Sequence, residues 1–211
     1  MSWGVFVAKM VFMSSDSAPT NLTNHFLIAM PSLQDPLFSR SVVYLCEHSH
    51  RGALGLVINK PCEISLKGMF DKLELPLLRP DLGDAPVFFG GPVQTERGFV
   101  LHEAIFKDAD KPEEPVYSCT LMIPGGLEMT TSRDVLEAIS TGSGPRQVMV
   151  SLGYSAWGEG QLESELIDNS WITVEADVRV IFDTPVDQRY DQALQLLGLE
   201  AWMLLNDAGH A

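Results

Sequence analysis

Short connections between apolar segments are the feature that most restricts how this chain can fold. Residues 41–46 and 53–58 are apolar segments of strand type, and a brief polar connection ending in Gly52 separates them. Two strands joined by about five residues that include glycine are typical of an antiparallel hairpin. Parallel neighbours need a crossover of about a dozen residues or more. Because several other strand segments also follow one another closely, we expect a mixed α+β fold and not a doubly wound parallel sheet.

The remaining elements follow from apolar periodicity and from turn residues. Further strands are predicted at residues 25–30, 87–89, 98–102, 116–123, 147–152 and 171–174. Helical spacing is found at residues 64–73, 133–140 and 187–197, whereas the short apolar run 178–182 fits either type of element. Ser132 is predicted as a helix N-cap. Proline-containing stretches at 75–86 and 103–115 are predicted to be exposed connections.

Length and pattern favour one folded domain over residues 21–200 of the 211-residue chain. We interpret residues 1–20 as a disordered leader or a miscalled start, and residues 201–211 as a C-terminal tail. No apolar run approaches the roughly 20 residues that a membrane-spanning helix needs. The sequence therefore predicts no membrane association.

Charge restricts the partners that this chain can bind. Fourteen basic against 28 acidic side chains give a formal net charge of −14, and the basic residues are scattered singly. Such a balance repels nucleic-acid phosphates, so direct DNA binding is disfavoured. The three cysteines are widely spaced and include no CxxC pair, which indicates reduced thiols and a cytoplasmic protein. Cys119 is interpreted as a buried strand residue.

The stretch of residues 151–166 combines three glycines with two aromatic residues before a short acidic helix. We predict a loop from Gly153 to Gly160 in which the strand turns into the helix, with Trp157 packed near Trp171. A phosphate loop is disfavoured here, because no Lys-Ser/Thr pair follows the glycines and the nearby glutamates would repel an anion.

Other potential sites have both a chemical and a structural interpretation. Cys46, His48 and His50 alternate and could ligate zinc if the strand continued, but Arg51-Gly52 indicates that the strand has ended. We therefore predict no metal site. The histidines at 25, 48 and 102 lie in or beside apolar strands, where hydrogen-bonded structural histidines are expected more often than general bases.

Two short polar motifs were weighed in the same way. Gly90-Gly91 could expose backbone N–H groups to an anion or could form a tight turn or bulge that curves the sheet, and we favour the second interpretation. Asn59 precedes Lys60-Pro61, a combination whose ordinary use is a turn.

Six blocks of this sequence, taken in order, resemble the YqgE/AlgH family of bacterial proteins. The resemblance spans about residues 21–200 and is found at residues 24–31, 43–48, 55–61, 89–93, 98–102 and 153–166. It implies a bifurcated, mostly antiparallel sheet that is rolled into a pseudo-barrel and flanked by several helices. It also implies a bacterial cytosolic protein. Some members have been described as transcriptional regulators through a link to alginate production, and the family supplies no catalytic residues to carry over.

Two functional hypotheses rank ahead of a third, a DNA-binding regulator, which the net charge disfavours. The first is a non-enzymatic binding or regulatory protein, with an unidentified protein or small molecule as partner and no cofactor. The second is an undetected enzyme, with His48 or His102 as base beside the two glycine-rich loops. The candidate pocket for either function comprises His48, Asn59, Gly90, Gly91, His102, Gly153, Tyr154 and Trp157. Oligomeric state does not follow from the sequence.

Overall fold

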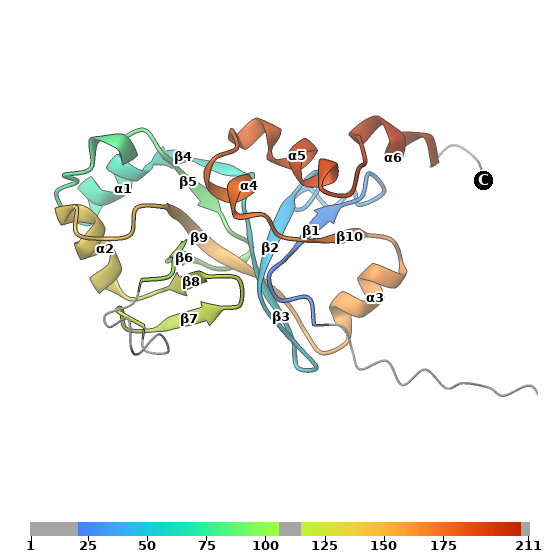
Figure 1. Cartoon of the computed structure of the whole chain (residues 1–211), viewed down its shortest axis with the longest axis horizontal. Coiled ribbons are helices and arrows are strands. Elements are labelled where there is room, and N and C mark those ends of the chain that lie inside the picture. Colours follow the sequence, from blue (N-terminus) through green and yellow to red (C-terminus); the bar gives the residue numbers. More distant parts are fainter. Residues whose placement is uncertain (1–20, 106–114, 208–211) are drawn as a thin grey trace, which may run out of the picture.

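The computed structural model describes residues 21–105 and 115–207, and Figure 1 shows how its helices and strands are arranged. Within those ranges the strands are β1 (His25–Ala29), β2 (Val42–Ser49), β3 (Gly52–Val57), β4 (Pro61–Ser65), β5 (Pro86–Phe89), β6 (Val93–Glu103), β7 (Thr120–Ile123), β8 (Leu127–Thr130), β9 (Val148–Trp157) and β10 (Trp171–Glu175). The helices are α1 (Leu66–Lys72), α2 (Arg133–Thr141), α3 (Gln161–Ile167), α4 (Val178–Phe182), α5 (Arg189–Gln195) and α6 (Ala201–Asp207), with short 3₁₀ turns at Pro80–Leu82 and Val186–Gln188.

The strands form one branched sheet. Its main path runs in the order β10-β1-β2-β3-β9-β6-β8-β7, and β4 and β5 lie off this path as a branch. The pairings are antiparallel except that between β5 and β9, which is parallel. Figure 1 shows the sheet curving so that β7 and β8 lie opposite β2 and β3. The predicted α+β fold with a bifurcated sheet curled into a half-barrel is confirmed.

The branch point lies in the middle of β9. Beyond Gly153, residues Ser155 to Trp157 pair with β3, whereas Ser151 and Leu152 pair with β5 along the same edge. The opposite edge of β9 pairs with β6. Strand β9 therefore joins two halves of the molecule. One half contains β1, β2, β3 and β10, and the other contains β4 to β8.

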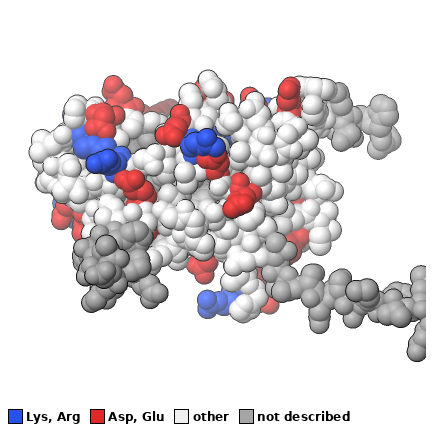
Figure 2. All heavy atoms as spheres, in the orientation of Figure 1, with Lys and Arg blue, Asp and Glu red and all other residues white. Residues whose placement is uncertain are grey.

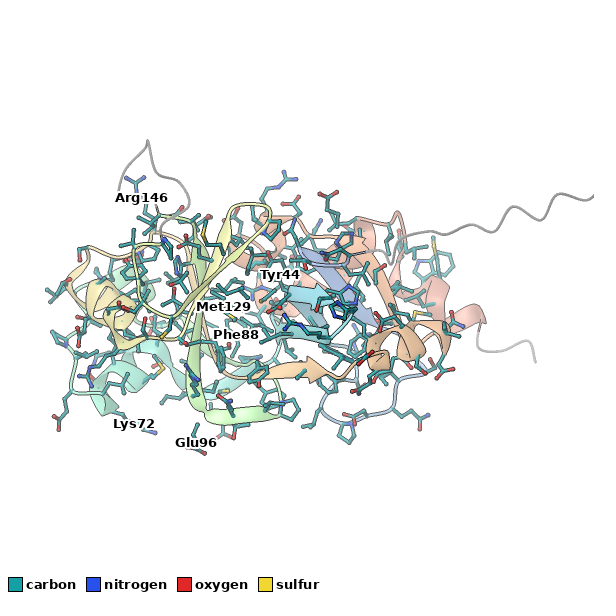
Figure 3. The ribbon with its side chains drawn as sticks, turned by 90° about the horizontal axis from the view of Figure 1, so that it is seen from below. Tyr44, Lys72, Phe88, Glu96, Met129 and Arg146 are labelled. Carbon is teal, nitrogen blue, oxygen red and sulfur yellow. The ribbon has the colours of Figure 1, made fainter. Side chains whose placement is uncertain are left out.

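Three apolar clusters result from this arrangement. The central cluster lies inside the half-barrel, between the two halves, and is covered by α4, α5 and α6. A second cluster fills the outer face of β1–β3 beneath α3. The third lies on the outer face of β6 and β9, beneath α1 and α2. In Figure 3 the core residues Tyr44, Phe88 and Met129 lie toward the middle of the molecule, and Lys72 and Arg146 lie at its periphery.

Many of the predicted elements are present. The β2–β3 hairpin is antiparallel as expected. Helices α1 and α5 and strand β1 lie within the predicted ranges, and α2, β5 and β10 extend beyond theirs by one residue. The run 178–182 is helical. Trp157 packs edge-on against Trp171 with ring centroids 6.0 Å apart, as predicted.

The prediction of a loop from Gly153 to Gly160 is wrong. Strand β9 continues through Gly153 and Tyr154 to Trp157, and only residues 158–160 form the turn into α3. The strand continues because β3 supplies a new partner from Ser155 onward, after the pairing with β5 has ended at Leu152. The glycines in this stretch predicted a break in the strand. Gly153 instead lets the backbone of β9 approach that of Gly91.

Several smaller predictions also need correction. Strand β2 extends to Ser49, so His48 is a strand residue and not part of the connecting loop. Cys119 is exposed and precedes β7, because its φ of 48° bends the chain before the ladder begins. The short strands β4 and β8 were not predicted. Residues 201–207, predicted as tail, form α6, which packs Ala201 and Leu204 against the central cluster. The predicted leader, residues 1–20, and most of the predicted connection, residues 106–114, lie outside the described residues.

Candidate functional site

An apolar cavity of about 260 Å³ lies between α1 and α2, over the outer face of β6 and β9. We call it the α1–α2 cavity. Apolar side chains make up most of its wall, and a few polar residues stand at its edge. Its lining comprises Met69, Leu73, Leu75, Glu96, Gly98, Val100, Thr130, Thr131, Ser132, Arg133, Leu136, Val150 and Leu152.

Strand alternation and one glycine explain why this space is empty. Gly98 and Val100 are two residues apart on β6, so they face the same side of the sheet, as do Val150 and Leu152 on β9. A β-carbon placed on Gly98 would meet no atom within 4 Å. Its backbone does not require glycine through a positive φ. The missing side chain at Gly98 therefore leaves part of the cavity open.

The polar edge of the cavity is formed by Glu96 and by the start of α2. Arg133 makes an exposed ion pair with Glu137, one helical turn further on, at 3.0 Å. The Ser132 hydroxyl contacts the Asp134 carboxylate at 2.5 Å and the Ser118 carbonyl oxygen. Ser132 occupies the predicted N-cap position, but its hydroxyl does not cap the helix. The edge thus offers both charges and hydroxyls around an apolar interior.

Thr130, which lines the cavity, is hydrogen-bonded to a group of polar residues that includes the buried His102. His102 is fully buried, and its Nδ1 lies 2.8 Å from the backbone carbonyl oxygen of Glu103, so Nδ1 carries the proton and donates. Its Nε2 therefore accepts from the Thr130 hydroxyl at 2.9 Å. Thr130 is also 2.7 Å from the Thr120 hydroxyl. Burial lowers the pKa of His102, which favours this neutral form.

Glu128 is the unusual member of this group. It is 1% exposed, and neither carboxylate oxygen makes a hydrogen bond with the described residues. Its Oε2 is 3.9 Å from His102 Nδ1, too far for a hydrogen bond. Burial raises the pKa of Glu128, and the nearby backbone N–H of Ile105 acts in the opposite direction. A carboxyl group in such surroundings favours its neutral form.

The eight residues predicted as one pocket lie in several different places. Gly90 and Gly91 do meet β9, because a β-carbon on Gly90 would lie 2.2 Å from the Gly153 carbonyl oxygen. A β-carbon on Gly91 would lie 2.2 Å from the Tyr154 carbonyl carbon. These four residues therefore form a tight backbone crossing at the branch point of the sheet and leave no space there.

His48 lies in a different part of the molecule and is held by two hydrogen bonds. The backbone N–H of Leu22 donates to its Nδ1 at 3.0 Å, so Nε2 carries the proton and donates to Glu163 at 3.0 Å. His48 and His102 are thus both hydrogen-bonded through their two ring nitrogens. A bulge between Leu45 and Glu47 turns the chain, so that Cys46 faces the central cluster whereas His48 faces α3.

Asn59 and Trp157 also have structural contacts. The Asn59 side chain accepts from the Val42 N–H at 2.8 Å and donates to the Arg40 carbonyl oxygen at 2.9 Å, which fixes the turn after β3. The Trp157 indole N–H donates to Glu165 at 2.9 Å, and the Trp171 indole donates to the same oxygen at 2.8 Å. Glu165 therefore joins α3 to both tryptophans.

Sequence reasoning missed the α1–α2 cavity because its lining comes from separate segments between residues 69 and 152. Gly98 was included in a predicted strand, and a single glycine inside a strand pattern is a known signal of missing packing or of close approach. That signal could have indicated a hollow in the sheet surface. Among the described residues, no group of three potential metal ligands lies together, and no helix is long and apolar enough to cross a membrane.

Comparison with known proteins finds a matching family and similar sequences. Residues 26–202 match the family model DUF179, described as AlgH-like. A UPF0301 protein of Variovorax paradoxus is 74% identical over 199 residues, which cover 94% of this chain and 100% of the relative. A UPF0301 protein of Albidiferax ferrireducens shows the same identity and coverage.

Solved structures with the same fold come from two other bacteria. The solution structure of AlgH from Pseudomonas aeruginosa is 44% identical and has a TM-score of 0.71, with 92% of this chain and 98% of that chain covered. The crystal structure of protein DIP2367 from Corynebacterium diphtheriae is 18% identical and has a TM-score of 0.63, with 82% and 86% covered. The second similarity concerns the fold alone.

Proposed function

This chain belongs to the AlgH-like family, and on that basis we propose that it is a non-enzymatic binding or regulatory protein of the cytoplasm. The observation that carries this proposal is the α1–α2 cavity. Its wall is mostly apolar, and its lining contains no histidine or cysteine that could act as base or nucleophile. The two buried histidines are engaged in hydrogen bonds on both ring nitrogens. Such a cavity is suited to holding an apolar group and not to transforming it.

Size and polarity define what the cavity would accept. A designed cavity of about 150 Å³ in another protein is large enough for benzene, so 260 Å³ accommodates a somewhat larger compact group. Glu96 and Arg133 at the edge would meet the polar end of the same ligand. We infer that the ligand presents one compact apolar group, either as a small molecule or as a side chain of a partner protein.

The charge of the protein argues against DNA as its ligand. Figure 2 shows acidic side chains distributed over the visible face, with basic side chains in small separate groups between them. A phosphate backbone needs a continuous basic surface to bind tightly. A role in regulation would therefore act through a small molecule or a protein.

Filling the cavity tests the proposal. In Gly98→Val, the added side chain occupies open space and improves strand propensity, so we expect the protein to stay folded and to lose its affinity for apolar probes. Indole is titrated into isotope-labelled protein, and binding is followed by NMR shifts of Val100 and Val150. The wild type should show saturable shifts, and Gly98→Val should weaken binding at least tenfold.

Thr95→Val is the matched control. It places the same β-branched residue on the same strand, at an exposed position that does not line the cavity. Equal indole binding by Gly98→Val and wild type, or no binding by the wild type, would contradict the cavity proposal. Turnover of p-nitrophenyl acetate by the wild type, lost in His102→Gln but retained in His25→Gln, would contradict the non-enzymatic part.

A further inference from the structure

The half-barrel is not closed between β7 and β3, and a cleft of about 380 Å³ opens there. We call it the seam cleft. Leu54 of β3 and Leu121 of β7 stand on its two sides. Phe99, Met129 and Tyr154 also line it and belong to the central cluster or pack against it. In Figure 3, Met129 lies in the middle of the molecule. The seam cleft therefore borders the central cluster, whose residues Phe99 and Met129 are 4% and 5% exposed.

The seam cleft has the opposite charge to the molecule as a whole. The chain carries a formal net charge of −14, yet no aspartate or glutamate lines the seam cleft, and Arg97 does. Arg97 forms no ion pair with a carboxylate among the described residues. An unpaired guanidinium beside an apolar surface is a favourable partner for an anion.

Arg97 is exposed, and side-chain contacts orient its guanidinium group. One terminal nitrogen donates to the Thr131 hydroxyl at 2.8 Å, and the other lies 3.5 Å from the Gln94 side-chain oxygen. The guanidinium carbon lies 5.8 Å from the centre of the Phe99 ring, within the range of a cation–π contact. Because a guanidinium has five N–H donors, these contacts leave donors for a ligand.

The backbone around Arg97 is constrained as well. Gln94 and Cys119, which both line the seam cleft, have positive φ values of 52° and 48°. Such values are uncommon for residues other than glycine and often accompany functional sites. The Thr131 N–H donates to the Cys119 carbonyl oxygen at 3.2 Å. Cys119 is therefore linked to Thr131, whose hydroxyl accepts from Arg97.

The aromatic surface beside Arg97 supplies the second half of a site. The rings of Phe99 and Tyr154 have centroids 5.2 Å apart and are tilted by 55°. Flat apolar groups bind well against such rings. We propose that the seam cleft binds a small organic anion with a flat aromatic body, such as an aryl carboxylate. The carboxylate pairs with Arg97, and the ring lies against Phe99 and Tyr154.

This site is separate from the α1–α2 cavity, and the two differ in ligand chemistry. Thr131 is the one residue that lines both. The proposal therefore does not depend on the proposed function, and its failure would leave the α1–α2 cavity unaffected. Gly98→Val should leave the seam cleft unchanged.

Titration with 1-naphthoate tests the site directly. We expect saturable binding to the wild type, and Arg97→Gln should raise the dissociation constant at least tenfold because the charged pair is lost. The neutral analogue 1-naphthalenemethanol should bind the wild type at least tenfold more weakly than naphthoate, and Arg97→Gln should remove that difference. Arg146→Gln, at an exposed arginine on the periphery (Figure 3), is the matched control and should bind like the wild type.

Cys119 provides a second readout. Its thiol is exposed and lines the seam cleft, whereas Cys62 is half-buried elsewhere and Cys46 is buried. Saturating naphthoate should slow alkylation of Cys119 by iodoacetamide at least fivefold, measured by peptide mass spectrometry, without changing the rate at Cys62. The proposal is wrong if naphthoate does not bind at 5 mM, if it binds Arg97→Gln equally well, or if Cys119 is not protected.

Discussion

At the scale of single residues, the buried carboxyl group of Glu128 has the clearest physical consequence. Its side chain faces the buried His102 and the partly polar Tyr117, and its oxygens lack hydrogen bonds to the described residues. An ionised carboxylate in this position is shielded from water, and among the described residues the Ile105 backbone N–H offsets only part of that cost. The folded protein therefore binds the proton of Glu128 more tightly than the unfolded chain does.

We expect the pH dependence of stability to follow from that difference. Because the pKa of Glu128 is raised in the folded state, its contribution is fully present below the ordinary glutamate pKa of about 4.3 and is lost as the pH rises through the raised value. Glu128→Gln cannot ionise. The free energy of unfolding of this variant relative to the wild type should improve by about 1–3 kcal/mol between pH 4 and pH 8, measured by urea denaturation.

Glu63→Gln is the control for that experiment, because it neutralises an exposed glutamate that also lies in a strand. The free energy of unfolding of Glu63→Gln relative to the wild type should change by less than about 0.5 kcal/mol over the same pH range. A Glu128→Gln variant that loses stability relative to the wild type as the pH rises would show that the carboxylate has a favourable partner in the folded protein.

At the scale of helices and strands, the sequence predicted local elements well and long-range pairings poorly. The β2–β3 hairpin depends on adjacent residues, so its apolar runs and short connection were sufficient to predict it. The α1–α2 cavity could not be predicted, because Met69, Thr130 and Val150 approach one another only after the sheet has formed. Its one local signal was Gly98.

Strand β9 shows why glycine is ambiguous in a sequence. Gly153 has a φ of 71°, and its backbone lies against that of Gly91. Here a strand uses both the positive φ and the close backbone approach that glycine permits. Gly160 has the same φ but ends the turn before α3. The sequence around the two residues does not distinguish these roles. The difference arises from Gly91, which follows β5 in the sequence and lies against Gly153 in the folded chain.

The same comparison yields a prediction. A β-carbon on Gly153 would lie 2.4 Å from the Gly91 carbonyl oxygen, whereas one on Gly160 would meet nothing within 4 Å. Gly160→Ala should therefore cost only the strain of a left-handed alanine, about 1–2 kcal/mol. Gly153→Ala should cost about 1–3 kcal/mol more, measured by urea denaturation of both variants. Equal losses would mean that the branch point can shift to admit a methyl group.

At the scale of the whole molecule, the two halves share the central cluster and strand β9. The central cluster contains Phe26 and Tyr44 from one half, and Leu101 and Met129 from the other. Because β9 pairs with strands of both halves, neither half can lose its structure without exposing apolar surface of the other. We therefore expect the described residues to unfold as one cooperative unit.

A substitution in one half should therefore be detected by a probe in the other. Ile139 is a fully buried residue of α2 in the third cluster, and Trp157 and Trp171 report on the second cluster near α3. Ile139→Ala should remove about 2–5 kcal/mol, which corresponds to a fall of about 5–15 °C in the unfolding midpoint. In a background with Trp3 and Trp202 replaced by phenylalanine, tryptophan fluorescence and far-UV circular dichroism should shift together. If the fluorescence midpoint stays at its original temperature while circular dichroism shows two transitions, the halves unfold independently and the shared central cluster does not couple them.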